Sequence, residues 1–232
     1  QVLLDAFITY ETHGDLNADR SNVILYPTWY AGTHEANRGA IGDGRALDPS
    51  KYFIVVPDMF CNGMSSSPSN TPPPFDRARF PLVTPYDNVM AQQRLLTEKY
   101  RIEKIAMVVG FSMSAQQAYH WGVQFPAMVG SIAPICGSAR TSTHNWLFLE
   151  GVKLALQSDA AWAGGDYQDP PTSGLRAFST VYAGWAASQT FYRQGLHLDL
   201  LGMQMKSMDE YLDFMTGFFS QVDANDLLGM VA

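Results

Sequence analysis

Short unbroken apolar runs alternate with segments of helical periodicity up to residue 135. Runs of strand length lie at 23–26, 52–56 and 105–109. Runs of this kind, without polar alternation, are typical of strands that are buried on both faces of a parallel sheet. The periodicity also predicts helices over 87–100 and 114–125 and a fourth parallel strand over 128–135. This order of elements predicts an α/β domain with right-handed crossover connections.

The pattern changes after residue 140, where helical periodicity continues without another run of strand type. The predicted helices of this section lie at 146–156, 175–187 and 208–222. A helical block on an α/β core is most simply an insertion that caps the carboxyl ends of the strands. We therefore expect a core over 1–139 and a helical lid over 140–232.

The segment Gly110-Phe111-Ser112-Met113-Ser114 lies between the predicted strand at 105–109 and the helix that follows. A strand, a tight turn and a helix form the context of a nucleophile elbow, in which small residues let the strand and helix approach. Ser112 would then project its hydroxyl above the sheet. Ser114 replaces the usual final glycine, so the pattern is G-x-S-x-S. The alternative is an ordinary strand-to-helix turn in which Ser112 caps the helix.

An acyl-serine mechanism also needs two donors for the oxyanion. We expect the N–H of Met113, at the helix N-terminus, to face the oxygen of an attacked carbonyl. The second donor comes from the loop after an earlier strand, and the loop 27–32 follows the run at 23–26. The N–H of Tyr30 is the candidate and Trp29 is the alternative, although both side chains also suit an aromatic wall.

A serine hydroxyl needs a histidine as general base and a carboxylate that orients the histidine. In a chain with a nucleophile elbow these partners follow the serine, on loops after later strands, and no strand-type run follows residue 135. We expect each histidine to be a surface or packing residue, with His34 nearest to the site because it lies in the oxyanion-side loop. The histidines are His13, His34, His120, His144 and His197. The sequence thus predicts a chain that ends before its acid and its base.

The charge, the apolar runs and the cysteines of the chain argue against several classes of binding partner and site. The net charge of -7 offers no basic face to nucleic acid or to anionic lipid. The apolar runs are much shorter than the roughly 20 residues of a membrane span, so we expect no membrane partner. Cys61 and Cys136 lack metal-ligand spacing, which argues against a zinc site or a disulfide framework and favours a cytoplasmic setting.

Several segments make the chain resemble the homoserine O-acetyltransferase-like family of α/β-hydrolases. Residues 10–17 read Y-E-T-H-G-D-L-N against the family's Y-E-T-x-G-x-L-N, and 110–117 read G-F-S-M-S-A-Q-Q against G-G-S-M-G-G-M-Q. The segments 45–53, 62–68 and 223–225 add to the resemblance. It implies an α/β-hydrolase fold, with a mostly parallel sheet flanked by helices, a helical lid insertion and Ser112 as nucleophile. It also implies a truncated chain that lacks the C-terminal part with the catalytic Asp and His.

One departure from the family concerns the substrate. Members that accept homoserine carry A-R-x-x-A-H-L-T-Y in a lid helix, and the counterpart at 183–191 places Gly184 and Phe191 at the arginine and tyrosine positions. Loss of the guanidinium removes a bidentate contact to the substrate carboxylate, so homoserine is disfavoured. The aromatic residues here suggest a more apolar pocket or, alternatively, the core of the lid; they are Tyr182, Trp185, Phe191 and Tyr192.

The sequence therefore favours a carboxylic ester hydrolase of the acetylesterase type. It would act on a small-molecule acyl ester through Ser112, Met113 and Tyr30, without a metal or redox cofactor. A second interpretation is O-acyl transfer with acetyl-CoA as acyl donor. A third is a non-catalytic fragment that lacks the triad Asp and His. A homodimer is left open as the oligomeric state.

Overall fold

The computed structural model describes residues 3 and 5–232, which form two compact units. One comprises the described residues up to Arg140 together with Ala232, and the other comprises Thr141–Val231. None of the helices in the described part of the chain combines the length and the apolar character that a membrane crossing requires. Each unit has its own core.

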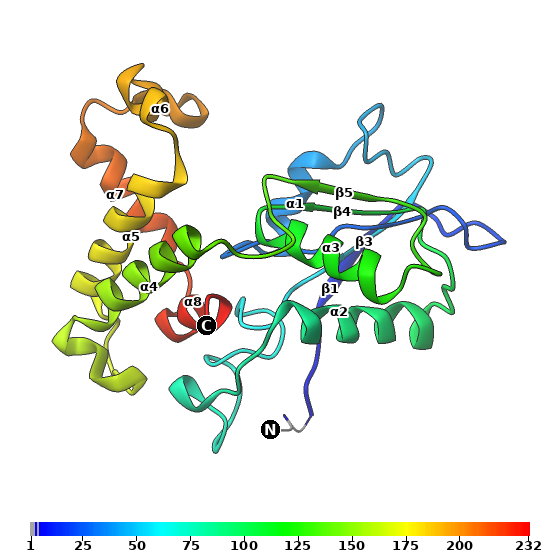
Figure 1. Ribbon diagram of the computed structural model, residues 1–232, viewed down its shortest axis with the longest axis horizontal. Helices are drawn as coiled ribbons and strands as arrows, with labels where there is room; N and C mark the ends of the chain where they lie inside the picture. Colours follow the sequence, from blue (N-terminus) through cyan, green and yellow to red (C-terminus); the bar gives the residue numbers. More distant parts are fainter. Residues whose placement is uncertain (1–2, 4) are drawn as a thin grey trace. The chain divides into compact units, whose positions relative to one another are not determined.

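A five-stranded sheet, counted over the described residues, forms the centre of the first unit in the order β1-β3-β2-β4-β5 (Figure 1). Its strands are β1 (Tyr10–His13), β2 (Val23–Leu25), β3 (Phe53–Pro57), β4 (Met107–Phe111) and β5 (Ile132–Ile135). The pairs β2–β3, β2–β4 and β4–β5 are parallel, whereas β1 is antiparallel to β3. The predicted α/β fold with a mostly parallel sheet is confirmed.

The structure corrects the predicted strands at both ends of the sheet. β1 was not predicted, because its sequence Tyr-Glu-Thr-His contains no apolar run and its residues are only half buried, as an edge strand allows. β4 begins at Met107, because Ile105 forms only an isolated bridge with Val129. The predicted strand at 128–135 is correspondingly reduced to β5 and this bridge.

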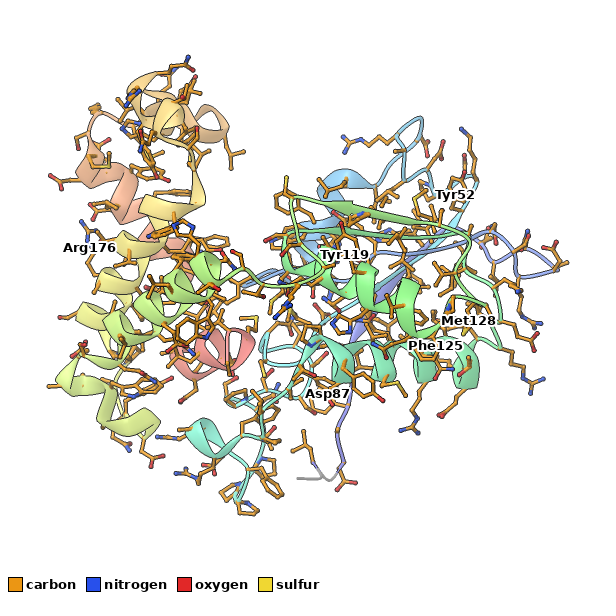
Figure 2. All side chains as sticks on the ribbon, viewed as in Figure 1. Tyr52, Asp87, Tyr119, Phe125, Met128 and Arg176 are labelled. Carbon is orange, nitrogen blue, oxygen red and sulfur yellow. The ribbon has the colours of Figure 1, made fainter. Side chains whose placement is uncertain are left out.

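Side-chain alternation along the strands gives the sheet two apolar faces. Val23 and Leu25 belong to the cluster on one face, and Ile24 belongs to the cluster on the other. The first cluster contains Val89 of α2 (Pro85–Arg94) and Trp121 of α3 (Met113–Gln124), and these helices lie side by side (Figure 1). Phe125 and Met128, beyond the end of α3, pack against the same cluster (Figure 2).

The start of α2 follows from its local sequence. Thr84 and Asp87 form a reciprocal capping box, and Pro85 occupies the first turn, where its missing N–H has no cost. The helix continues into a π-helical turn at Leu95–Lys99, so the helix predicted at 87–100 begins two residues earlier than its apolar positions suggested. The remaining short helices of this unit are α1 (His34–Asn37) and the 3-10 turns Arg38–Ala40 and Arg77–Arg79.

The second unit is helical, and all its residues are described without a strand among them. Its elements are α4 (Thr143–Gln157), the 3-10 turn Ala160–Gly165, α5 (Thr172–Ala186), α6 (Gln189–Arg193), the 3-10 turn Leu196–Gly202, α7 (Met208–Phe219) and α8 (Ala224–Met230). The ring of Tyr182 packs 5.4 Å from Phe148 and 4.8 Å from Phe219, measured between centroids. Tyr182 is therefore part of the aromatic core of this unit.

Candidate active site

Ser112 occupies the single residue between β4 and α3. Its backbone angles are φ 56° and ψ -121°, a region that L-residues rarely adopt and that costs about 1–3 kcal/mol. Its N–H donates to the carbonyl of Ile135 at 2.9 Å, which ties the turn to β5. Ser112 occupies the N-cap position of α3, but its side chain makes no capping hydrogen bond there, so the structure does not show the side-chain cap that the alternative interpretation required.

Two glycines make room for this turn. A Cβ at Gly110 would lie 2.2 Å from the backbone oxygen of Ser114, and a Cβ at Gly137 would lie 2.6 Å from that of Ser112. Both distances are shorter than any carbon-to-oxygen contact, so neither position tolerates a side chain without backbone movement. Gly110 was predicted to be small for this reason. Gly137 was missed, although a glycine just after the predicted strand at 128–135 is a signal of close backbone approach.

Met113 is the first residue of α3. N–H groups in a first helical turn have no intrahelical acceptor, and the helix dipole places partial positive charge there. The peptide N–H that follows Ser112 is thus suited to stabilise an anion beside the serine.

The loop after β2 approaches the same end of the sheet. The N–H of Thr28 donates to the carbonyl of Pro57 at 3.1 Å, which extends the β2–β3 pairing, and the N–H of Gly32 donates to the carbonyl of Trp29 at 3.0 Å. The indole of Trp29 contacts the ring of Phe111 edge to face, with centroids 6.0 Å apart. Tyr30, the sequence candidate for the second oxyanion donor, is buried in this loop. The structure therefore brings the loop beside the residue that precedes Ser112.

A buried carboxylate holds the far end of this loop, and it was not among the predicted site residues. Asp58 directly follows β3 and is fully buried. Its Oδ1 accepts from the N–H of His34 and from Nδ2 of Asn62, both at 2.9 Å, and its Oδ2 accepts from Oγ1 of Thr9 at 3.0 Å and from Nδ1 of His34 at 2.6 Å. An Asp at the carboxyl end of a parallel strand is the signal that could have identified it.

The histidines do not pair with Ser112 within the described residues. His34 pairs with Asp58, and Nε2 of His13 lies 3.3 Å from Oε2 of Glu11. His120 contacts Gln124, so it is engaged on its own helix, as the spacing along α3 predicted. In the helical unit, His144 packs on Trp185 and His197 lies among Phe191, Tyr192 and Tyr211. His34 is the histidine with a fully buried carboxylate partner.

The residues compared with the homoserine clamp lie on two helices of the second unit. Gly184 belongs to α5, and an added Cβ there would meet no atom within 4 Å. Phe191 belongs to α6, and its ring packs near His197. Trp185 stacks on Phe148 with centroids 5.2 Å apart. No cluster of three or more metal-ligating side chains occurs among the residues that the structure describes.

Comparison with known proteins places these features among esterases and acyltransferases. No protein-family model matches the chain. The ethyl acetate hydrolase of Pseudomonas veronii is 43% identical over 230 residues, which cover 97% of this chain and 65% of that protein. The homoserine O-succinyltransferase of Stutzerimonas stutzeri is 32% identical over an alignment of 260 residues, covering 99% of this chain and 68% of that protein.

Comparison with solved structures also finds similarity to an esterase. The crystal structure of an acetylester hydrolase from Corynebacterium glutamicum matches with a TM-score of 0.95 and 38% identity, covering 100% of this chain and 67% of that one. The chain spans about two thirds of the length of the curated relatives it matches, 65% of the ethyl acetate hydrolase among them.

Proposed function

Because the chain belongs to the homoserine O-acetyltransferase-like family of α/β-hydrolases, we propose that it carries the nucleophile of an acetylesterase-like carboxylic ester hydrolase. The observation that supports this most strongly is the conformation of Ser112, with φ 56° at the end of a buried parallel strand and directly before a helix N-terminus. This conformation stores backbone strain of about 1–3 kcal/mol. It is accounted for if the hydroxyl must stand clear of the sheet to meet a substrate.

In the proposed reaction, Oγ of Ser112 attacks the carbonyl carbon of a small acyl ester. The carbonyl oxygen becomes an oxyanion, for which the N–H groups of Met113 and Tyr30 are the proposed donors. Collapse of the tetrahedral intermediate breaks the bond to the alcohol, which leaves with a proton, and water then hydrolyses the acyl-serine. The serine must lose its proton to a general base, and none of the described histidines makes that hydrogen bond to Ser112.

A second candidate is transfer of the acyl group from acetyl-CoA to an alcohol. The relationship to the homoserine O-succinyltransferase supports it, since hydrolysis and transfer share the acyl-serine and differ only in whether water or an alcohol accepts the acyl group. Hydrolysis is preferred because the proteins of higher identity include an ethyl acetate hydrolase. The glycine at position 184 points the same way, because it offers no guanidinium to an amino-acid carboxylate.

We further propose that Thr141–Val231 acts as the lid, that the substrate is a small-molecule ester and that the protein works in the cytoplasm. The helical composition and separate aromatic core of this unit support the first proposal. The second proposal follows from the proposed reaction. The low cysteine content, with Cys61 and Cys136 as the two cysteines of the sequence, supports the proposal of a cytoplasmic setting.

The test is an assay of the full-length protein with p-nitrophenyl acetate, and with acetyl-CoA plus homoserine, in which the products are identified by mass. We expect ester hydrolysis and an acetyl group trapped on the peptide that contains Ser112. Ser112→Ala should lower turnover by at least about 10³-fold. Ser21→Ala, which removes an exposed hydroxyl that bonds Asp19, is the matched control and should retain full activity.

Two outcomes would contradict the proposal. Turnover that survives in Ser112→Ala would exclude Ser112 as nucleophile. O-acetylhomoserine as the main product, with little free acetate, would replace hydrolysis by acyl transfer.

A further inference from the structure

We propose that Ser114 and Gln117 are positioning residues that set the distance between the two oxyanion donors. Their side chains fasten the loop that carries Tyr30 to the helix that begins with Met113. This inference rests on the proposed function, because it concerns how the proposed oxyanion site is held in shape.

Ser114 makes the first of these links. It lies in the first turn of α3 and is fully buried, and its hydroxyl donates to the carbonyl of Pro27 at 2.6 Å. Its backbone packs against Gly110, and the usual nucleophile-elbow pattern has glycine at the position of Ser114. A glycine could not form the hydrogen bond by which the Ser114 hydroxyl links the turn before α3 to the loop after β2.

Gln117 makes the second link, on the same face of α3. Its Nε2 donates to the carbonyl of Thr28 at 3.1 Å, and its Oε1 accepts from Nε2 of Gln92 at 2.6 Å. Oε1 of Gln92 in turn accepts from Nε1 of Trp121 at 2.8 Å. The indole is only a donor, so it fixes which end of Gln92 is oxygen, and Gln92 then fixes Gln117. The orientation that points the Gln117 amide at the loop is thus determined by buried neighbours.

Pro27 and Thr28, the two loop residues bonded by α3, also form hydrogen bonds with Asn37 and Met59. The carbonyl of Pro27 also accepts from Nδ2 of Asn37 at 3.2 Å, and Oγ1 of Thr28 accepts from the N–H of Met59 at 3.0 Å. Two consecutive peptide groups are therefore fixed, and Tyr30 follows two residues later. A shift of either carbonyl would move the donor on Tyr30 relative to the donor on Met113, which is part of α3 itself.

This fixed spacing matters because oxyanion stabilisation depends on donors placed in advance at about 2.7–3.1 Å from the developing charge. Complete loss of one donor costs roughly 10²–10³ in kcat. A displaced donor is weakened without being lost, so we expect a decrease in kcat of about 10-fold to 100-fold when one link is removed.

The test compares Ser114→Ala and Gln117→Met with Ser131→Ala. The control removes the same kind of bond, since the Ser131 hydroxyl donates to the carbonyl of Ala106 at 2.9 Å before β5. We expect both test variants to lower kcat for p-nitrophenyl acetate by about 10-fold or more, with KM changed by less than about twofold. Their affinity for a short alkyl boronic acid, which forms a tetrahedral adduct with Ser112, should fall by the same factor as kcat/KM. The control should change neither quantity.

The inference is overturned if folded Ser114→Ala and Gln117→Met keep kcat, or if KM rises while kcat stays constant. If Gln117→Met does not fold, Ser114→Ala decides alone, because removing a hydroxyl creates neither a clash nor a large cavity. Failure of the proposed function is a separate result, in which wild-type turnover is absent or does not depend on Ser112.

Discussion

Nδ1 of His34 lies 2.6 Å from Oδ2 of Asp58, and the pair joins the loop after β2 to the end of β3. The same carboxylate accepts from the His34 N–H, from Asn62 and from Thr9. Each of these hydrogen bonds offsets part of the cost of burying the carboxylate, so the loss of any one of them should destabilise the fold.

We therefore predict that His34→Ala lowers the free energy of unfolding by about 3 kcal/mol, because it removes the shorter of the two hydrogen bonds to Oδ2 of a buried carboxylate and leaves only the one from Thr9. The measurement is urea unfolding of purified variants. His120→Ala is the control, since His120 bonds Gln124 one turn away on the same helix, and it should cost less than about 1 kcal/mol. Equal losses in the two variants would show that the Asp58 pair contributes nothing particular.

The backbone strain at Ser112 predicts that two variants without the serine hydroxyl differ in stability. Ser112→Gly should be more stable than Ser112→Ala by about 1–2 kcal/mol, because glycine adopts φ 56° without the penalty of a Cβ. Thermal unfolding of both variants measures the difference. The same pair of substitutions at Ser131, whose φ is not positive, should reverse the order. Greater stability of Ser112→Ala would be inconsistent with backbone strain at the nucleophile.

Two glycines of the helical unit should respond to alanine in opposite directions. Gly151 lies inside α4 with no atom within 4 Å of an added Cβ, so Gly151→Ala should raise the free energy of unfolding by about 0.5–1 kcal/mol. At Gly174 of α5 the added Cβ would lie 2.4 Å from the carbonyl oxygen of Leu156, so Gly174→Ala should lower it by at least about 1–3 kcal/mol. Chemical denaturation of both variants tests the packing of α4 on α5.

The lowered pKa of Asp48 predicts that the folded protein becomes less stable in acid. The hydroxyl of Ser50, at 2.7 Å, together with the N–H groups of Ser50 and Gly44, lowers the pKa of Asp48 from 3.8 to about 2. A carboxylate with a lowered pKa stabilises the fold above pH 3.8, and this contribution is lost as the pH falls through about 2. The melting temperature of Asp48→Asn should accordingly depend less on pH between about 4 and 2 than that of the wild type. Parallel curves over this window would contradict the assignment.

The buried central strands of the sheet were predictable because each is encoded by a continuous run of apolar residues. β2 and β3 are continuous apolar runs, and the turn at Ser112 follows the third such run. β1 leaves no such mark, since an edge strand half exposed to solvent needs no apolar run. The ends of β4 and β5 were misplaced because Ile105 and Val129 are buried or partly buried without belonging to a strand.

The residues of the candidate site were predictable only where a short local sequence pattern indicates them. Ser112 and Gly110 are recognised from a local pattern, whereas the pairing of Asp58 with His34 joins residues 24 positions apart. The bond from Ser114 to Pro27 joins residues 87 positions apart, and no periodicity reports on it. In the sequence, Ser114 is a departure from the usual G-x-S-x-G pattern. In the structure it makes an additional hydrogen bond.

That bond also has a consequence for sequence variation. Its acceptor is a backbone carbonyl, which every residue type provides, so the bond depends on the side chain at position 114 and not on the side chain at position 27. Substitutions at position 27 that keep the path of the backbone should therefore retain the bond, whereas a substitution at position 114 that removes the hydroxyl loses it.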